Sequence, residues 1–101
     1  MPDRRGRIEE ALRERLAAAH VEVLDESHLH AGHPGAASGA GHFRATVVSA
    51  RFEGLSRVAA QRLVYEALAD MMGPEIHALA MATYTPAQWA ARGARGEAEA
   101  R

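Results

Sequence analysis

Two stretches of the chain carry apolar side chains at helical spacing, and these stripes constrain the fold more than any other feature. In residues 3–19 the stripe consists of Ile8, Ala11, Leu12, Leu16 and Ala19. The second stripe follows Ser56, a typical N-cap residue, and consists of Ala60, Leu63, Val64, Ala67, Leu68 and Met71. Each predicted helix is apolar on one side, so that side must be buried against another element.

Three further segments are predicted to be strands. Residues 21–26 are rich in β-formers, residues 42–49 alternate apolar and polar side chains, and residues 76–84 form an alanine-rich strand. Gly73-Pro74 ends the second helix, and Thr85-Pro86 begins a short last helix. The order α-β-β-α-β-α predicts an α+β fold, in which helices pack on a three-stranded mixed sheet.

Residues 27–41 lie between the first two strands and have no periodicity. They hold four glycines, one proline and three histidines, which predicts an unusually long loop for so small a domain. The chain has 101 residues, enough for one small domain. We assign that domain to residues 1–92 and expect residues 93–101, a tail of Gly, Ala, Arg and Glu, to fray.

Charge and composition exclude several classes of function. The formal net charge is −1, which provides no general attraction to nucleic acid or to an anionic membrane. The chain has no cysteine, so it cannot itself supply a disulfide, a thiol nucleophile or a thiolate metal ligand. It also lacks a secretory signal and an apolar run of the roughly 20 residues that a membrane helix needs. We therefore expect a soluble cytoplasmic protein with no membrane partner.

Three of the six histidines, His28, His30 and His33, lie in the predicted loop. Their H-x-H-x-x-H spacing resembles the start of the metallo-β-lactamase metal motif. Gly32 stands where that motif needs an aspartate, and the chain is about half the length which that fold needs. Solvated loop histidines and metal ligands are the two remaining interpretations.

His77 begins the third strand, where a histidine is either a structural residue or a metal ligand, because neutral imidazole is the commonest protein ligand. His20 and His42 are interpreted as an ordinary helix-end residue and an ordinary strand-start residue. No nucleophile and base are spaced as a catalytic set. We therefore expect no enzymatic activity and no small-molecule substrate.

Taken together and in order, several segments resemble the BolA family over about residues 7–90. Asp-Glu-Ser-His-Leu-His at 25–30 resembles the family's D-E-S-x-x-H, and His42-Phe43 resembles its S-H-F. Val-Val-Ser-Ala-Arg-Phe-Glu-Gly at 47–54 resembles V-V-S-x-x-F-x-G, and residues 62–68 resemble the start of its main helix. Residues 76–80 and 85–89 resemble its closing strand and short helix. One departure is Ala60-Gln61-Arg62, where the family typically reads Arg-His-Arg.

The resemblance implies a class II KH-like fold and a partnership with a monothiol glutaredoxin. In such a heterodimer the two proteins share a 2Fe–2S cluster or dock without one. When a cluster is shared, the glutaredoxin cysteine and a bound glutathione supply the thiolates. The ligands implied from this chain are His77, which matches the family's I-H-A histidine, and His30, which matches the last position of D-E-S-x-x-H. His33 is the alternative to His30, and His28 comes third. We expect no cofactor in the isolated chain.

The resemblance also implies an alternative function, because other family members are DNA-binding regulators of morphology, stress-response and biofilm genes. The residues that would contact DNA are Arg51, Arg57 and Arg62, with Arg44 as a further candidate. The near-zero net charge, Gln61, and the lack of a second glycine in Gly-Leu-Ser-Arg at 54–57 weaken this interpretation.

Overall fold

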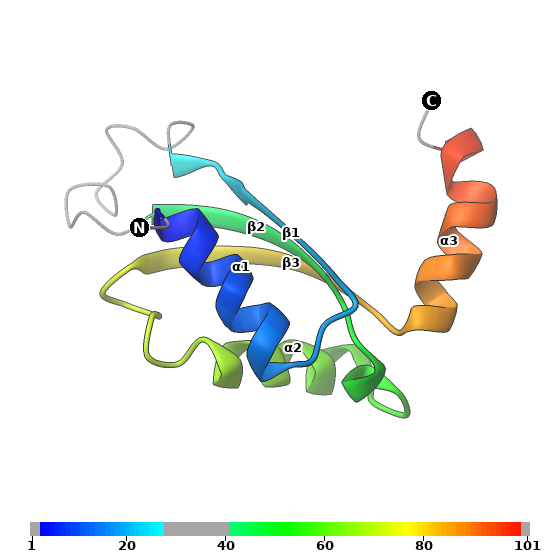
Figure 1. Cartoon of the computed structure of the whole chain (residues 1–101), viewed down its shortest axis with the longest axis horizontal. Helices are drawn as coiled ribbons and strands as arrows, with labels where there is room; N and C mark the ends of the chain where they lie inside the picture. Colours follow the sequence, from blue (N-terminus) through cyan, green and yellow to red (C-terminus); the bar gives the residue numbers. More distant parts are fainter. Residues whose placement is uncertain (1–2, 28–40, 100–101) are drawn as a thin grey trace.

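A computed structural model of the chain describes the backbone of residues 3–27 and 41–99, and the side chains of residues 3–27 and 41–92. The predicted order of helices and strands is confirmed, with one added 3-10 turn (Figure 1). The elements are α1 (Arg4–Arg15), β1 (His20–Asp25), β2 (Gly41–Val48), η3 (Ala50–Phe52), α2 (Arg57–Ala67), β3 (Ile76–Tyr84) and α3 (Pro86–Glu99).

The three strands form one mixed sheet in the order β1-β2-β3. β1 pairs antiparallel with β2, and β2 pairs parallel with β3. A parallel pair needs a crossover connection, which here contains η3 and α2. The end of β1 and the starts of β2 and β3 consequently lie at the same edge of the sheet, which we call the loop edge.

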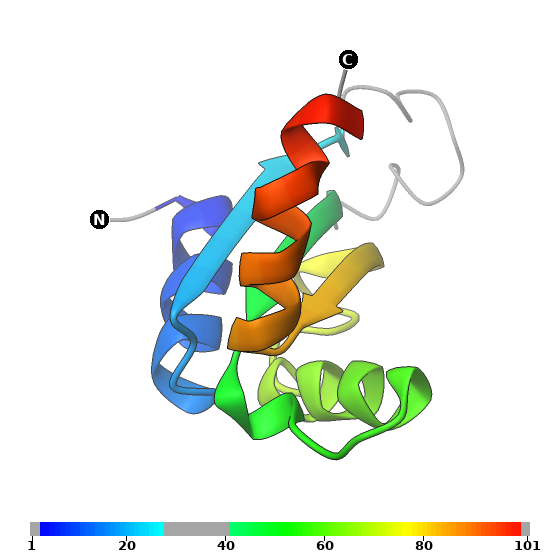
Figure 2. The same ribbon diagram turned by 90° about the vertical axis from the view of Figure 1, so that its right-hand side faces the viewer.

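Helices α1 and α2 cover one face of the sheet (Figure 2). Alternate strand residues point into this face, because side chains in a strand alternate between the two sides. The core joins both helices to the sheet, as the sequence stripes predict. Its most buried members include Ile8, Leu12, Val23, Phe43, Ala45, Val47, Val64 and Leu68.

Helix α1 is shorter than the stripe in residues 3–19 predicts. It ends at Arg15, and Ala17 adopts a left-handed φ of 49°, which turns the chain toward β1. His20 is therefore the first residue of β1 and not a helix-end residue. Leu16 and Ala18 still contact the core, so the apolar stripe continued past the end of the helix.

Arg15 joins the end of α1 to the segment after α2. Its Nη1 donates to the backbone oxygen of Ala67 at 2.7 Å and to Oδ1 of Asp70 at 2.7 Å. The hydrogen bond from Arg15 holds the pKa of the Asp70 carboxyl below its ordinary value. Both side chains are exposed, so this ion pair links the two helices but contributes little to the free energy of unfolding.

Helix α3 begins with the predicted cap. Thr85 Oγ1 accepts from the backbone nitrogen of Gln88 at 3.1 Å, and Gln88 Oε1 accepts from that of Thr85 at 2.8 Å. Trp89 then stacks on His20, with 4.9 Å between ring centroids, and lies 5.2 Å from the Tyr84 ring. These aromatic contacts hold α3 beyond the carboxyl end of β3, where it rises away from α2 (Figure 1).

The structure extends α3 to Glu99, whereas the sequence analysis ended a short helix before residue 93. Alanine, arginine and glutamate are strong helix formers, and here they outweigh two glycines in the tail. The division of the domain at residue 92 stays a prediction.

Residues 28–40, most of the predicted loop, lie outside the described residues. No helix in the described ranges is long and apolar enough to cross a bilayer.

Two valines on α2 test which side of the helix carries the core. Val64 is fully buried, whereas the Val58 side chain is 60% exposed. We expect Val64→Ala to lower the free energy of unfolding by about 2–3 kcal/mol, through lost burial and a residual cavity. Val58→Ala should raise it slightly, by up to about 0.5 kcal/mol, because alanine is the better helix former. Urea unfolding measures both, and equal losses would contradict the assignment of the buried face.

Candidate metal centre

His77 occupies an irregular position in the sheet, and this irregularity decides where its ring points. Gly41 pairs with Ile76 and the next residue, His42, pairs with Ala78, so His77 is an extra residue inserted on β3. Such a bulge interrupts the ladder and redirects the side chain of the inserted residue. His77 is exposed at the loop edge.

The ring of His42 lies beside that of His77. The centroids of the two imidazoles are 5.1 Å apart, and the planes are tilted by 54°. His42 follows the alternation of β2, in which Phe43 points into the core and His42 to the opposite face, yet only 8% of His42 is exposed. The structure thus pairs an exposed imidazole with a buried one, whereas the sequence analysis interpreted His42 as an ordinary strand-start residue.

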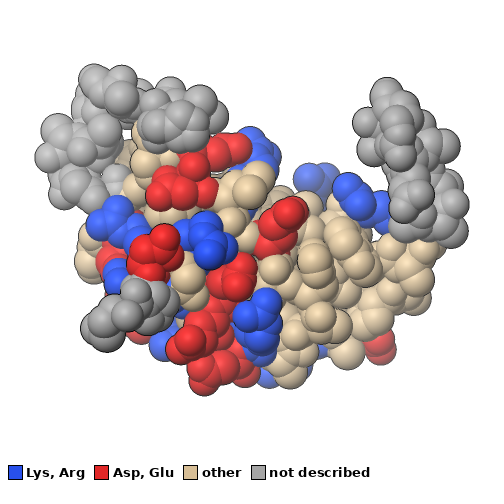
Figure 3. Space-filling view, turned by 45° about the horizontal axis from the view of Figure 1, so that its top comes forward, with Lys and Arg blue, Asp and Glu red and all other residues tan. Residues whose placement is uncertain are grey.

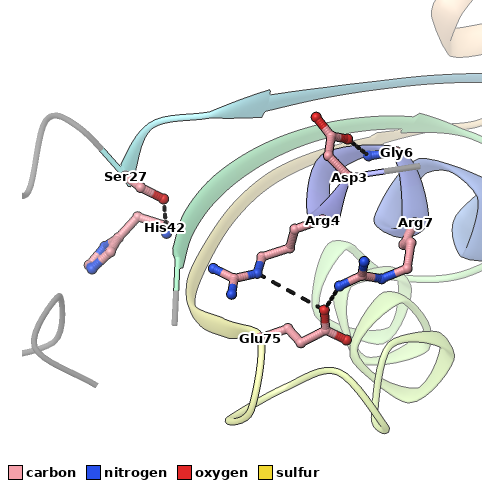
Figure 4. A network of polar contacts seen from close by, with 7 residues as sticks. All are labelled: Asp3, Arg4, Gly6, Arg7, Ser27, His42 and Glu75. Atoms are coloured by element: carbon pink, nitrogen blue, oxygen red, sulfur yellow. Dashed lines mark hydrogen bonds and ion pairs between the residues drawn. The ribbon is translucent and has the colours of Figure 1, made fainter. Parts of the chain in front are cut away.

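Residues 25–27, the Asp-Glu-Ser that precedes the loop, fold against the start of β2. Ser27 Oγ accepts from the backbone nitrogen of His42 at 3.1 Å (Figure 4), and the backbone nitrogen of Glu26 donates to the oxygen of His42 at 2.8 Å. Asp25 Oδ1 accepts from the backbone nitrogen of Ser27 at 2.9 Å. Glu26 also pairs with Arg44 at 3.1 Å. The motif therefore holds the entrance of the loop next to the imidazole pair.

Gly41 makes this close approach possible. A Cβ added there would lie 2.6 Å from the Phe43 ring and 2.8 Å from Ser27 Oγ, which is closer than real carbon atoms pack. The exit of the loop is therefore fixed at the same edge as its entrance. Both ends of the loop that carries His28, His30 and His33 lie next to the start of β2.

The start of β3 is held from the other face by α1. Arg7 donates to Glu75 Oε1, and the Arg4 guanidinium lies 4.0 Å from the same oxygen (Figure 4). The backbone oxygen of Glu75 accepts from the nitrogen of Gly41 at 3.0 Å. Glu75 thus links α1 to the segment that leads into β3 and to the start of β2, just before His77 and His42.

The predicted site residues fall into two groups. His77 is exposed at the loop edge, whereas His30 and His33, with His28, lie outside the described residues. Among the described residues, no three histidine, cysteine or carboxylate side chains are grouped so that they could hold a metal ion. Imidazole binds zinc, copper and iron. The described part of the loop edge thus brings two imidazoles together, and a metal site there would need donors from elsewhere.

A topological signal in the sequence could have identified His42. A strand-helix-strand order predicts parallel strands, and parallel strands start at the same edge of a sheet. The predicted strands at 42–49 and 76–84 both begin with or next to a histidine, so their proximity follows from the topology. The burial of His42 and the bulge at His77 could not be read from the sequence.

The arginines of the alternative DNA interpretation do not form one surface. Arg57 and Arg62 are five residues apart on α2, which places them about 140° apart around the helix. Arg51 extends toward the carboxyl end of α1, with its Nη1 at 3.4 Å from the oxygen of Arg15. Arg44 is paired with Glu26 on the sheet. On the face shown in Figure 3, acidic and basic side chains are interspersed.

Comparison with known proteins gives one consistent result. A family model described as BolA-like protein matches residues 12–88. Human BolA-like protein 1 is 47% identical over 88 residues, which cover 83% of this chain and 62% of the human protein. The DNA-binding transcriptional regulator BolA of Escherichia coli is 40% identical over 85 residues, which cover 84% of this chain and 78% of that protein.

Comparison with solved structures also matches the chain to a BolA-like protein. The crystal structure of a Bol-like protein from Babesia bovis matches with a TM-score of 0.74 and 35% identity, over 92% of this chain and 95% of that chain. The chain accounts for less than two thirds of the human relative's length. The names of these relatives describe BolA-like proteins and a regulator, and none of the three names describes an enzyme.

Proposed function

The chain belongs to the BolA-like family, and we propose that it partners a monothiol glutaredoxin and shares a histidine-ligated 2Fe–2S cluster with it. The proposed role is iron–sulfur trafficking or iron sensing in the cytoplasm, without catalysis by this chain. The observation that carries the proposal is the exposed imidazole of His77, which lies at the edge where both ends of a histidine-bearing loop are anchored.

In the proposed complex the ligands from this chain are His77 and a loop histidine. His30 is three residues from Ser27, so its Cα lies within about 11 Å of the Ser27 Cα by covalent geometry alone. His33 is six residues away and has a longer reach of about 21 Å. The shorter tether favours His30, and His33 stays the alternative.

The remaining ligands must come from outside this chain, which has no cysteine. The glutaredoxin active-site cysteine and a bound glutathione would supply thiolates, and a 2Fe–2S cluster tolerates imidazoles on one iron with thiolates on the other. Replacing thiolates by neutral imidazoles removes negative charge and raises the reduction potential of the cluster. In this arrangement His42 would act as a positioning residue beside the His77 ring.

The sheet face that carries His42 offers room for the partner. Ala78 and Ala80 are exposed on this face of β3, and Ala82 is half-buried. Small side chains let another protein approach the backbone closely, and the row begins next to His77. We expect the glutaredoxin to dock over these alanines, between the loop edge and α3.

DNA binding is the second candidate function. It is favoured by the Escherichia coli relative, which is named a DNA-binding transcriptional regulator and is 40% identical. It is weakened by the net charge of −1 and by the separation of Arg51, Arg57 and Arg62. A nanomolar, steeply salt-dependent shift of promoter DNA by the isolated chain would reverse the order of the two candidates.

The ligand assignment is tested by reconstitution. The chain is mixed with a monothiol glutaredoxin, glutathione, iron and sulfide, and visible absorption and circular dichroism are recorded. We expect a heterodimer whose spectrum differs from that of the glutaredoxin homodimer, and we expect His77→Ala and His30→Ala to abolish that difference. His20→Ala is the control. The native His20 ring stacks on Trp89, so its loss should leave the wild-type spectrum unchanged. Wild-type spectra from both ligand variants would refute the assignment, and loss in His33→Ala with a silent His30→Ala would transfer the role to His33.

Imidazole ligation also predicts a dependence on pH. A proton competes with iron for the imidazole nitrogen, so the mixed cluster should weaken as pH falls from about 8 to about 5.5, through the ordinary histidine pKa of about 6.5. The visible spectrum of the heterodimer measures this loss, and the all-thiolate glutaredoxin homodimer is titrated in parallel. An unchanged heterodimer spectrum over this range would argue against histidine ligands.

The docking face is tested by a bulky charged side chain on β3. Ala80 pairs with Arg44 in the sheet, so the carboxylate in Ala80→Glu has a cation beside it and the fold should be retained. We expect this variant to weaken binding to glutaredoxin at least about tenfold, because the larger side chain would clash with the partner and its carboxylate would lose contact with water on docking. Ala69→Glu, at an exposed position after α2, is the matched control and should bind normally. Titration calorimetry measures both, and normal binding by Ala80→Glu would exclude this face.

A further inference from the structure

β3 is an outer strand of the sheet, and one of its sides has no neighbouring strand. The backbone oxygen of Tyr84 accepts from the nitrogen of Ser49, which follows β2, at 3.0 Å, so the backbone of Tyr84 faces β2. Backbone direction alternates along a strand, and the groups of Leu79, Met81 and Thr83 therefore point outward. Within the described ranges none of these outward groups forms a hydrogen bond. We call the outward side of residues 78–84 the free edge.

The chain itself covers only the start of β3. Met72 forms a single bridge with Ile76. The backbone nitrogen of Ile76 donates to the oxygen of Met71 at 3.0 Å, and its oxygen accepts from the nitrogen of Gly73 at 2.9 Å. From Ala78 onward the pairing of β3 with β2 is regular, so no bulge twists the free edge away from an incoming strand.

The side chains of the free edge also offer no protection against pairing. Natural sheets discourage pairing at their edges with charged residues, prolines or bulges. Residues 78–84 read Ala-Leu-Ala-Met-Ala-Thr-Tyr and contain neither a proline nor a charged side chain. β1, the other outer strand, contains Glu22 and Asp25 among its six residues. Of the two outer strands, β3 is therefore the one that is suited to accept another strand.

The outward groups select how two copies of this edge can pair. In an antiparallel pair, the residues that exchange both backbone hydrogen bonds face each other. A two-fold axis at Met81 pairs Met81 with its own counterpart and Leu79 with Thr83, which gives about six hydrogen bonds. An axis one residue closer to Ile76 would bring the end of the second strand onto Ile76, whose outward groups are already bonded within the chain. The register with the axis at Met81 avoids this conflict.

A second exposed apolar feature lies on the same side of the molecule. In the layer of helices, α1 contacts β1 and α2 contacts β3 (Figure 2). The backbone oxygen of Ala67 on α2 accepts from Arg15 on α1, and Tyr65 lies about 160° around the helix from Ala67. Tyr65 and Val58 are seven residues apart on one stripe and are 42% and 60% exposed. Both side chains therefore project away from α1, toward the side of the free edge.

We propose that the chain forms a two-fold dimer in which the free edges of two copies pair antiparallel across Met81. Side chains that are opposite each other in such a pair lie on the same face, so the helices of both copies cover one face of a continuous sheet. A second copy brings its own Val58 and Tyr65 to that face, whereas an extended peptide would cover the strand edge alone. Residues 78–84 carry no charge, so two identical edges meet without repulsion. This inference is independent of the proposed glutaredoxin partnership.

Sedimentation equilibrium of the full chain tests the proposal. We expect a reversible monomer–dimer equilibrium with a Kd below about 1 mM, which is weak because the paired edges are short. Thr83→Pro removes an outward N–H that does not bond to β2, and proline is tolerated at such edge positions. We expect this variant to weaken dimerisation at least about tenfold while its far-ultraviolet circular dichroism stays native. Thr83→Val retains the N–H and the branched shape, and this control should dimerise like the wild type.

The register is tested with cysteines, which the sequence lacks. An axis at Met81 sets Ala80 opposite Ala82 of the second copy, in a pair without backbone hydrogen bonds whose Cα atoms lie about 4.5 Å apart. A disulfide can span this distance. Mild oxidation should therefore cross-link a mixture of Ala80→Cys and Ala82→Cys, whereas either variant alone should run as a monomer on a non-reducing gel.

Two results of sedimentation would overturn the proposal: a monomer at every concentration up to about 1 mM, or wild-type dimerisation by Thr83→Pro. Efficient cross-linking of Ala80→Cys alone, or none in the mixture, would refute pairing across Met81. The cysteine test does not depend on the proline variant and decides the proposal if that variant fails to fold. His77→Ala should dimerise normally, which separates this test from that of the metal centre.

Discussion

Parallel pairing between β2 and β3 requires the chain to return from one end of the sheet to the other, and α2 makes this crossing on the face that α1 also covers. Both strands then begin at the loop edge, where β1 ends. The alignment brings together the Asp-Glu-Ser motif, His42 and His77, which come from three distant parts of the sequence. The antiparallel pairing of β1 with β2 joins the motif to His42, and the crossover adds His77, which would otherwise lie at the opposite end of the sheet.

The two ends of the sheet differ in their chemistry. At the loop edge, imidazoles lie above a backbone that Glu75 ties to α1 and that Ser27 ties to β2. Support of this kind would suit the ligand role proposed for His77, because metal coordination depends on how the surrounding residues orient the ligand. At the other end, Arg57 and Arg92 line a groove between the η3–α2 turn and the start of α3, and none of its described lining residues is acidic. One end thus presents two imidazole rings, and the other presents two guanidinium groups.

Sequence patterns predicted the elements well where a local signal was strong. β3 begins at Ile76 and ends at Tyr84 as predicted, because Gly73-Pro74 and Thr85-Pro86 mark both sides of it, and Gly73 adopts a positive φ of 96°. The predictions were less accurate at α1 and α2, whose apolar stripes extend past the ends of the helices. Leu16, Leu68 and Met71 are buried in the core from turns, since burial depends on the position of a side chain and not on the helical state of its backbone.

The sequence by itself determined the family, the order of the elements, the absence of thiolate ligands and the identity of His77 as a candidate ligand. The first three follow from residue types and short-range spacing, whereas the candidacy of His77 follows from the family resemblance. Only the tertiary structure decided that His42 lies 5.1 Å from His77, that a bulge presents His77 at the edge, and that His20 stacks on Trp89. It also decided that Arg57 and Arg92 share a groove while Arg62 faces elsewhere. These features depend on strand register and on packing between residues distant in sequence, which local patterns do not encode.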